Sequence, residues 1–264
     1  MSYKFMSFHK PDEHNAVQWA ERSIEGEIES CETRTLVEIF DKYIVDKKMK
    51  ILEAGCGLGG WVNYYSTKGF QIVGIEIDKN IVDQVKKYDS KIPVEHGDIF
   101  NIDYPNEQFD AYISLGVVEH FEEGPHKPIN EANRVLKTGG IAFVTVPYLS
   151  WFRRLFVHPL RNIFFFVYKL LGKKTYFWEY RYSKNEMINF LKDAGFEIID
   201  IDIDDYIRTD KKHHIGLYGD FFFLRKKNGE IWELNTLGKF TLFFSRLFSP
   251  WLACSGIHLV AKKK

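Results

Sequence analysis

The 264-residue sequence predicts an α/β protein with a doubly wound, mostly parallel sheet of seven strands. From Met49 to Pro147, short apolar runs alternate with helical segments, and this alternation requires parallel strands joined by crossover helices. Two later strand-like runs, FEIIDIDID and GIHLVAKK, bring the expected number of strands to seven. Hydrophobic content of 45% and charged content of 27% are ordinary for a globular chain of one large domain.

The elements divide the chain into four parts. Residues 1–48 have apolar residues at helical spacing and are expected to form an N-terminal helical cap. Residues 49–147 form the core, with strands expected at 50–55, 70–77, 92–98, 109–116 and 141–147, and helices at 57–68, 79–88 and 129–136. A basic, aromatic insert spans 148–182. Residues 183–264 resume the pattern with a Ser-capped helix at 183–194, and a second insert covers about 206–253.

Composition excludes several classes of protein. Thirty-six basic residues balance thirty-six acidic ones, so no overall charge attracts nucleic acid, which is an unlikely partner. No apolar run is long enough to span a membrane, and the N-terminus does not resemble a signal peptide. Cys31, Cys56 and Cys254 form no CxxC pattern, which is typical of a chain in the reducing cytoplasm.

The clearest motif is the glycine-rich segment EAGCGLGG at residues 53–60, which follows the first core strand and begins a helix. Glycines at this turn let backbone amides approach a ligand, and a helix N-terminus favours negative charge. By spacing alone the segment would also suit a dinucleotide. A tight turn without a ligand is the simplest alternative.

Three carboxylates narrow the choice of ligand. Glu53 precedes the first glycine, where it would repel a pyrophosphate but attract an ammonium group. Glu76 ends the second strand, where an acid can accept hydrogen bonds from ribose hydroxyls. Asp98 ends the third strand and could accept from an adenine amino group. S-adenosylmethionine carries all of these groups, so the acids favour it over the dinucleotide of a dehydrogenase.

The core resembles the class I S-adenosylmethionine-dependent methyltransferases. The matching stretches are ILEAGCGLGG, VGIEID, HGDIF, FDAYISLGVVEHF and RVLKTGGIAFVTVP, in the order and spacing typical of that family. SKNEMINFLKDAGFEII extends the match, whereas the first fifty residues and both inserts lie outside it. The resemblance implies a Rossmann-like fold and methyl transfer to a small-molecule or lipid-linked acceptor.

The resemblance also implies roles for individual residues. The acid at Glu53 orders the loop and faces the ammonium group, and the acid at Glu76 binds the ribose. The remaining cofactor contacts are expected at Ala54, Gly55, Gly57, Ile77, Asp98, Ile99, Leu115 and Gly116. Glu76 replaces the commoner Asp of the family, which adds one methylene group and should permit the same contact.

Methyl transfer needs a base only where the acceptor must lose a proton, as a phenol or hydroxyl must. His120 lies just past the fourth strand, where the methyl group should emerge, and is the candidate base. Packing of the following loop is the alternative role for His120. His213 and His214 have no further ligand pattern around them, so no metal site is expected.

The insert carries much of the unusually high aromatic content of 16%. Residues 148–178 contain no acid, and apolar residues recur at helical spacing between Arg153, Arg154 and further basic residues. Tyr148, Trp151 and Phe152 are candidate acceptor-binding residues. Pro159 should kink or split the helix. Residues 239–251 show the same combination of aromatic and basic residues.

Two interpretations of these stretches remain open. They could form a lid packed over the active site, or they could also touch an anionic membrane surface, which would make the protein peripheral to the membrane. Three alternatives to methyl transfer onto a small or lipid-linked acceptor also remain. The protein could bind S-adenosylmethionine without catalysis, bind a partner protein, or methylate RNA.

Overall fold

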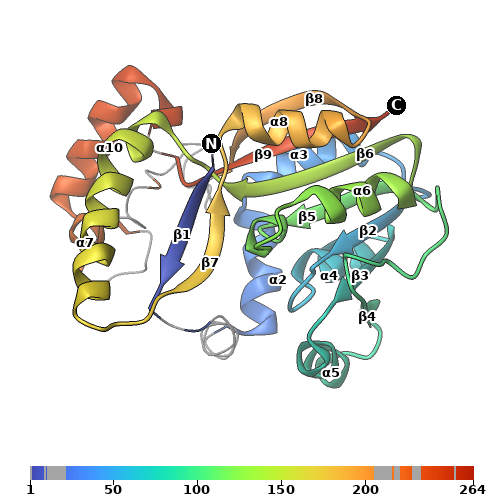
Figure 1. Cartoon of the computed structure of the whole chain (residues 1–264). Coiled ribbons are helices and arrows are strands. Elements are labelled where there is room, and N and C mark those ends of the chain that lie inside the picture. The colour runs from blue at the N-terminus through green and yellow to red at the C-terminus, as the bar shows by residue number, and fades with distance from the viewer. Residues whose placement is uncertain are drawn as a thin grey trace.

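The computed structural model describes residues 2–8, 10, 22–204, 216, 221–227, 233–252 and 254–264. Seven strands form one sheet in the order β4-β3-β2-β5-β6-β9-β8 (Figure 1). The first five along the chain pair in parallel: β2 (Lys50–Ala54), β3 (Gln71–Glu76), β4 (Val94–His96), β5 (Phe109–Leu115) and β6 (Leu136–Pro147). β8 (Phe196–Asp204) and β9 (Gly256–Lys263) complete the sheet, and β9 runs antiparallel to both neighbours. The predicted seven-stranded, mostly parallel sheet is confirmed.

Helices cover both faces of this sheet because successive strand residues point to opposite sides. Ile51 packs with the helices of one face, which are α2 (Ile24–Thr33), α3 (Leu36–Tyr43), α4 (Gly60–Thr67) and α5 (Lys79–Tyr88). The next residue, Leu52, packs with those of the other face, α6 (His126–Val135) and α8 (Lys184–Asp193). Two apolar cores, one on each side of the sheet, hold the strands in place.

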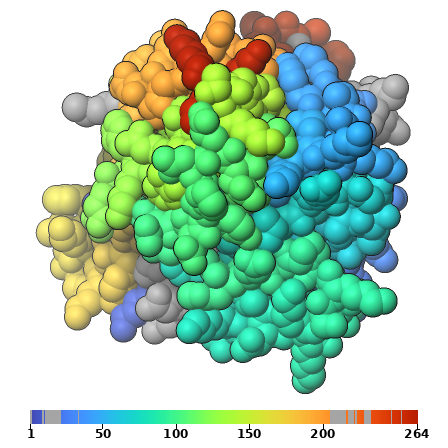
Figure 2. All heavy atoms as spheres, turned by 90° about the vertical axis from the view of Figure 1, so that its right-hand side faces the viewer, coloured from blue at the N-terminus to red at the C-terminus, as the bar shows by residue number. Residues whose placement is uncertain are grey.

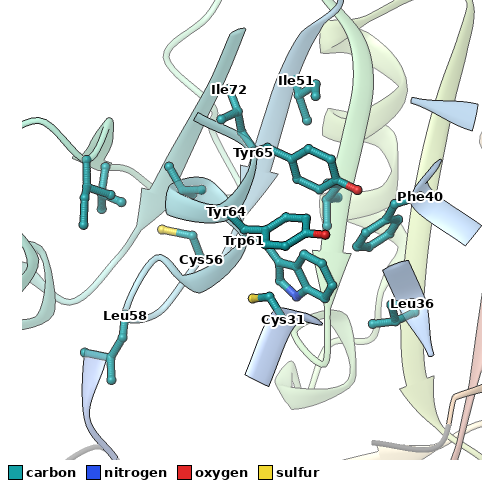
Figure 3. Packing of buried hydrophobic residues seen from close by; sticks show 14 of the residues in the cluster. Cys31, Leu36, Phe40, Ile51, Cys56, Leu58, Trp61, Tyr64, Tyr65 and Ile72 are labelled. Atoms are coloured by element: carbon teal, nitrogen blue, oxygen red, sulfur yellow. The ribbon is translucent and has the colours of Figure 1, made fainter. Parts of the chain in front are cut away.

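The first of these cores is rich in aromatic rings (Figure 3). Trp61 of α4 lies edge-on to Phe40 of α3 with their ring centroids 4.9 Å apart, and both side chains are buried. Such aromatic pairs contribute about 0.5–1.5 kcal/mol beyond the area that they bury. Part of the N-terminal region, α2 and α3, is thereby joined to the core of the domain.

Helix boundaries follow the local backbone. The expected helix at 57–68 begins only at Gly60, because Gly57 and Gly59 have φ angles of 52° and 72°, which an α-helix does not allow. The helix expected from residue 129 begins earlier, at His126. The Ser-capped helix was predicted correctly: Ser183 and Glu186 form a reciprocal capping box at the start of α8.

The expectation of a wholly helical N-terminal region is wrong at its beginning. β1 (Tyr3–Ser7) pairs antiparallel with β7 (Tyr176–Arg181) in a separate two-stranded sheet. The ring of Phe5 packs against two guanidinium groups, with its centroid 3.8 Å from Arg161 Cζ and 4.3 Å from Arg181 Cζ. Residues 11–21, with Trp19 among them, lie outside the described residues.

The aromatic insert is helical as far as Leu170, and its last part is the strand β7, which was not predicted. A π-helical turn (Arg153–Val157) leads directly into α7 (His158–Leu170), and Pro159 lies in the first turn of α7. The regular α-helix thus begins only beside Pro159, and the turn before it is π-helical, with the His158 amide donating to the Arg153 carbonyl. The predicted irregularity lies at this proline, which occupies the first turn of α7, where its missing amide proton costs no helical hydrogen bond. The second insert contributes short 3₁₀ turns at Phe222–Leu224 and Pro250–Leu252 and the helix α10 (Thr236–Phe248).

α7 and α10 lie on the same side of the molecule, beyond the β1–β7 pair (Figure 1). Phe152, at the start of the insert helix, and Leu242 of α10 both pack against a small apolar cluster of Leu224 and Leu234. Figure 2 shows the side opposite to these helices, where the teal and green segments from α5 to α6 form much of the surface.

Candidate functional site

The predicted site residues lie where the parallel strands end. Glu53 lies near the end of β2, Glu76 ends β3, Leu115 ends β5, and Asp98 follows β4. The carboxyl ends of parallel strands meet at one edge of a sheet, and ligands of open α/β sheets bind there. The fold therefore brings the three predicted acids to the same edge.

The glycine loop is held between β3 and the turn after β5. The Gly55 amide donates to the Ile75 carbonyl at 2.9 Å, and the Gly57 amide donates to Glu76 Oε2 at 3.0 Å. Gly55 has a φ of 78°, and a Cβ atom there would lie 2.6 Å from the side chain of Val117. Only glycine fits this position, so the loop and the end of β5 are in direct contact.

Glu53 is a buried acid beneath this loop, with 4% of its surface exposed. Burial raises the pKa of its carboxyl group to about 8, although Arg34 and the Val62 amide act to lower it. Its Oε2 atom has no hydrogen-bond partner in the part of the chain that the structure describes. A carboxylate in this position fits a ligand that brings a positive charge, because an ionised acid is costly to bury unpaired.

Glu76 and Asp98 are already engaged with the backbone. Glu76 Oε1 accepts from the Asp78 amide at 3.1 Å, so the carboxylate links the glycine loop to the start of α5. Asp98 Oδ1 accepts from the Phe100 amide at 2.8 Å. These contacts fix both acids, and each carboxylate oxygen keeps capacity for a second donor.

The two apolar residues predicted beside an adenine differ in burial. Ile77 exposes 60% of its surface next to Glu76, as expected for a side chain that covers a ligand. Ile99 is 6% exposed and packs into the core with α6 and α8, so its side chain supports the sheet edge from within.

A further acid, which the sequence analysis did not select, lies beside the end of β5. Glu119 belongs to a 3₁₀ turn (Val118–His120) and is 2% exposed. Its Oε1 atom is 3.5 Å from the position that a Cβ on Gly116 would occupy. The sequence predicted a role for His120 and none for its neighbour Glu119, yet the turn buries the glutamate and exposes the histidine.

Glu119 and Gly116 line a cavity of about 170 Å³. The wall includes the end of β6, the start of β9 and five charged side chains. These are Glu119, Arg153, Glu179, Arg181 and Asp204. This arrangement cannot be recognised from the sequence, since the five charged residues come from four segments that are distant along the chain.

The candidate base and the candidate acceptor residues lie outside the residues that line this cavity. His120 is exposed, and its Nδ1 atom is 2.9 Å from the carbonyl oxygen of Trp178. Tyr148 is half-buried against Trp251, and burial raises the pKa of its hydroxyl. Their roles stay predictions.

The two acceptor candidates in the insert also differ from each other. Trp151 is 57% exposed, whereas Phe152 packs toward α10. The expectation that Arg153 belongs to a basic surface is wrong: its guanidinium is 2% exposed and donates to the carbonyl of Cys254. No group of side chains suited to hold a metal ion occurs among the described residues, and His213 and His214 lie outside them.

Comparison with known proteins identifies the family. A family model described as "Methyltransferase domain" matches residues 52–144. A probable S-adenosylmethionine-dependent methyltransferase of Mycolicibacterium smegmatis is 25% identical over 150 residues, which are 57% of this chain and 52% of that protein. The rice 2-methyl-6-phytyl-1,4-hydroquinone methyltransferase 1 is 26% identical over 213 residues, which are 75% of this chain and 53% of that protein.

The fold agrees with this match. A chain from the complex between the Haloferax volcanii Trm112 methyltransferase activator and a methyltransferase superposes with a TM-score of 0.62 at 17% identity, over 96% of each chain. The present chain spans about half the length of the first curated relatives it matches. Residues 52–144 match the methyltransferase domain family, and the relatives and the fold support a class I S-adenosylmethionine-dependent methyltransferase, whose cofactor is S-adenosylmethionine.

Proposed function

We propose that this protein transfers a methyl group from S-adenosylmethionine to a small-molecule or lipid-linked acceptor. The observation that carries the proposal is the buried Glu53 oxygen beneath a glycine loop, which has no hydrogen-bond partner among the described residues, together with a charged cavity lined by Gly116. Glu53 and the loop glycines would hold the amino-acid end of the cofactor. Glu76 and Ile77 would hold its ribose and adenine, and Asp98 the adenine amino group.

When bound, S-adenosylmethionine supplies a methyl group activated by a sulfonium. The protein then has to exclude water and position the acceptor, which can provide most of the rate acceleration. Leu115 and Gly116 would separate the cofactor from the cavity. Gly116 has a φ of 67° and no side chain, which leaves room for two reacting groups to approach each other there.

His120 remains the proposed base for a hydroxyl or phenol acceptor. Its Nδ1 can donate to the Trp178 carbonyl, and in that tautomer Nε2 carries the basic lone pair. Tyr148, Trp151 and Phe152 would contact the acceptor from the insert.

The insert supports an acceptor held at a membrane surface. Large apolar side chains on α7, the turn before it and α10 are exposed by 41–79%, so they do not pack on the sheet. They include Trp151, Leu155, Phe156, Leu160, Ile163, Phe164, Phe240, Phe243, Leu247 and Phe248. Arg154, Lys169, Lys173 and Lys174 are exposed in the same insert.

Exposed rings accompanied by cations are typical of helices that lie in an anionic membrane interface. No helix within the described ranges is long and apolar enough to cross a membrane, so any contact made by these helices would be peripheral. The name of the rice relative gives a phytyl-substituted hydroquinone as its acceptor, which agrees with a lipid-like acceptor here.

The test is to incubate the protein with S-adenosylmethionine and a panel of phenols, amines and lipid extracts. Mass spectrometry then measures the S-adenosylhomocysteine that is produced. Turnover with any acceptor, abolished with the cofactor-site variant Glu53→Ala, supports the proposal. Calorimetric binding of S-adenosylmethionine without turnover on any acceptor would instead favour a non-catalytic binding protein.

A further inference from the structure

The cavity beyond Gly116 holds three acidic side chains that the cofactor site does not use. Glu119 lies on the turn after β5, Glu179 on β7 and Asp204 at the end of β8. Glu119 and Asp204 expose 2% and 8% of their surface, and the Glu179 side chain exposes 13%. Buried acids gathered by three separate elements are costly unless a ligand or a counter-charge compensates them.

Both positive charges on the wall have hydrogen-bond partners in the protein. Arg181 Nε donates to Glu179 Oε1 at 3.3 Å, so this acid has a partner within its own strand. Arg153 donates to the Cys254 carbonyl. Glu119 and Asp204 are thus the two acids on the wall that none of the observed ion pairs includes.

Glu119 is the wall acid that lies beside Gly116. Its Oε2 has no hydrogen-bond partner among the described residues, and its Oε1 lies beside Gly116. Burial raises the pKa of the Glu119 carboxyl well above its usual value, and the charges of Glu179 and Asp204 raise it further. Within the described residues, this Glu119 oxygen can therefore accept a hydrogen bond from a ligand next to the point where the methyl group would emerge.

We propose that the acceptor is an amine whose nitrogen donates to Glu119 and Asp204, so that the reaction is N-methylation. This inference rests on the proposed function and narrows its acceptor class. The alkylammonium form gives one proton to the Glu119 carboxylate. The neutral nitrogen then forms the N–C bond while the C–S bond breaks, and the electron pair of that bond stays on sulfur.

Charge decides between nitrogen and oxygen as the acceptor atom. An amine gains positive charge as it is methylated, and the Asp204 carboxylate can stabilise this charge while Glu119 holds the proton. A hydroxyl or phenol has to develop negative charge before it attacks, and Glu119 and Asp204 would oppose this, whereas Glu179 is paired with Arg181. After transfer the methylammonium product leaves, and Glu119 releases its proton to solvent.

The amine could belong to a free small molecule or to a lipid headgroup, and the two sources can be told apart. The probes are the n-alkylamines from ethylamine to octylamine with their matching alcohols, titrated into the complex with S-adenosylhomocysteine by calorimetry. Vesicles of phosphatidylcholine with and without phosphatidylethanolamine are the second arm, with methylated headgroups measured by mass spectrometry.

We expect amines to bind and the matching alcohols not to bind. Glu119→Gln and Asp204→Asn should each weaken amine binding by at least about tenfold. Glu123→Gln, which changes an exposed acid on the same loop, should leave it unchanged. Methylation only of phosphatidylethanolamine vesicles would identify the lipid source, and methylation of alkylamines would identify the free one.

The inference is overturned if the protein binds S-adenosylhomocysteine but no amine in either arm, or if Glu119→Gln leaves amine binding intact. Methylation of alcohols or phenols in place of amines would also overturn it while supporting methyl transfer itself. If the parent protein does not bind S-adenosylhomocysteine at all, the proposed function is contradicted instead. If Glu119→Gln does not fold, Glu119→Asp retracts the carboxylate by one methylene group and serves as the second variant.

Discussion

At the scale of single residues, the buried carboxyl of Glu53 makes stability depend on pH. Its pKa rises from 4.5 to about 8 on folding, so between these values the folded state holds a proton that the unfolded state has released. The free energy of unfolding of the ligand-free protein should therefore fall as pH rises from about 5 to about 8. The contribution of Glu53 is on the order of 1–4 kcal/mol across this window.

Denaturant unfolding at several pH values would measure this effect. Asp204 and Glu119 also have raised pKa values, so the parent curve alone is not specific. The difference between the parent and Glu53→Gln isolates Glu53: the variant should lose less stability as pH rises. Parallel curves for the two proteins would show that Glu53 is ionised in the folded, ligand-free state.

Glu76 has two tasks, and its removal should affect both. Glu76→Ala deletes the acceptor of the Gly57 and Asp78 amides and two expected ribose contacts. Hydrogen bonds to a charged group contribute about 1.5–3 kcal/mol each, so S-adenosylmethionine should bind at least about tenfold more weakly. Unchanged calorimetric affinity in a folded variant would remove Glu76 from the site. NAD should show no tight binding to the parent.

His120 can be tested separately from Glu119. If the acceptor is a hydroxyl or phenol, His120→Ala should lower the rate at neutral pH by about 10²–10⁴-fold. A loss of less than about threefold would give His120 a packing role, in keeping with its contact to the Trp178 carbonyl. That result would also agree with an amine acceptor, whose proton Glu119 rather than His120 is proposed to accept.

At the scale of elements, the exposed face of α7 and α10 should bind anionic vesicles. Co-sedimentation with phosphatidylserine vesicles should exceed that with neutral ones and should weaken with salt. Arg154→Glu with Lys169→Glu should reduce it by about 1 kcal/mol for each positive charge removed. Lys87→Glu on α5 is the matched control, because this exposed lysine belongs to a helix that packs on the sheet core.

The opposite outcome is equally clear. If the parent stays in the supernatant with both kinds of vesicle, the apolar face does not contact membranes, and an acceptor free in solution is favoured. Arg153 is unsuitable for this experiment because its buried guanidinium lines the cavity.

Elements built from local signals were predictable from sequence. The strand and helix alternation of the core, the Ser183 cap and the three strand-end acids need only neighbouring residues to be recognised. Features made by distant partners were not. β1 pairs with a strand more than 160 residues away, and the burial of Arg153 depends on the carbonyl of Cys254. The cavity acids were missed for the same reason, since no spacing connects Glu119 with Asp204.

At the scale of the whole molecule, the two sheets carry different groups of charged residues. The seven-stranded sheet carries the acids expected to hold the cofactor, whereas the β1–β7 sheet carries Glu179 and Arg181 of the cavity wall. β1 also joins this wall to the insert, because Tyr3 stacks on His158 with ring centroids 3.6 Å apart. We therefore expect this wall to loosen without loss of the proposed cofactor site.

Phe5 is the residue where this separation can be tested. Its ring lies against Arg161 and Arg181, and cation–π contacts of this kind contribute about 0.5–2 kcal/mol each. Phe5→Ala should speed hydrogen exchange of the β7 amides, because the strand loses its packing against β1. The amides of β2, β3 and β5 should exchange as in the parent, and S-adenosylhomocysteine should bind within about twofold of the parent affinity.

Phe5→Leu is the matched control, since it keeps apolar contact but removes the aromatic ring. An intermediate increase in β7 exchange is expected for it. If Phe5→Ala instead speeds exchange throughout the seven-stranded sheet and weakens cofactor binding to the same extent, the two sheets unfold as one unit. The wall of the cavity and the cofactor site would then be inseparable, and changes at β1 could not tune acceptor binding alone.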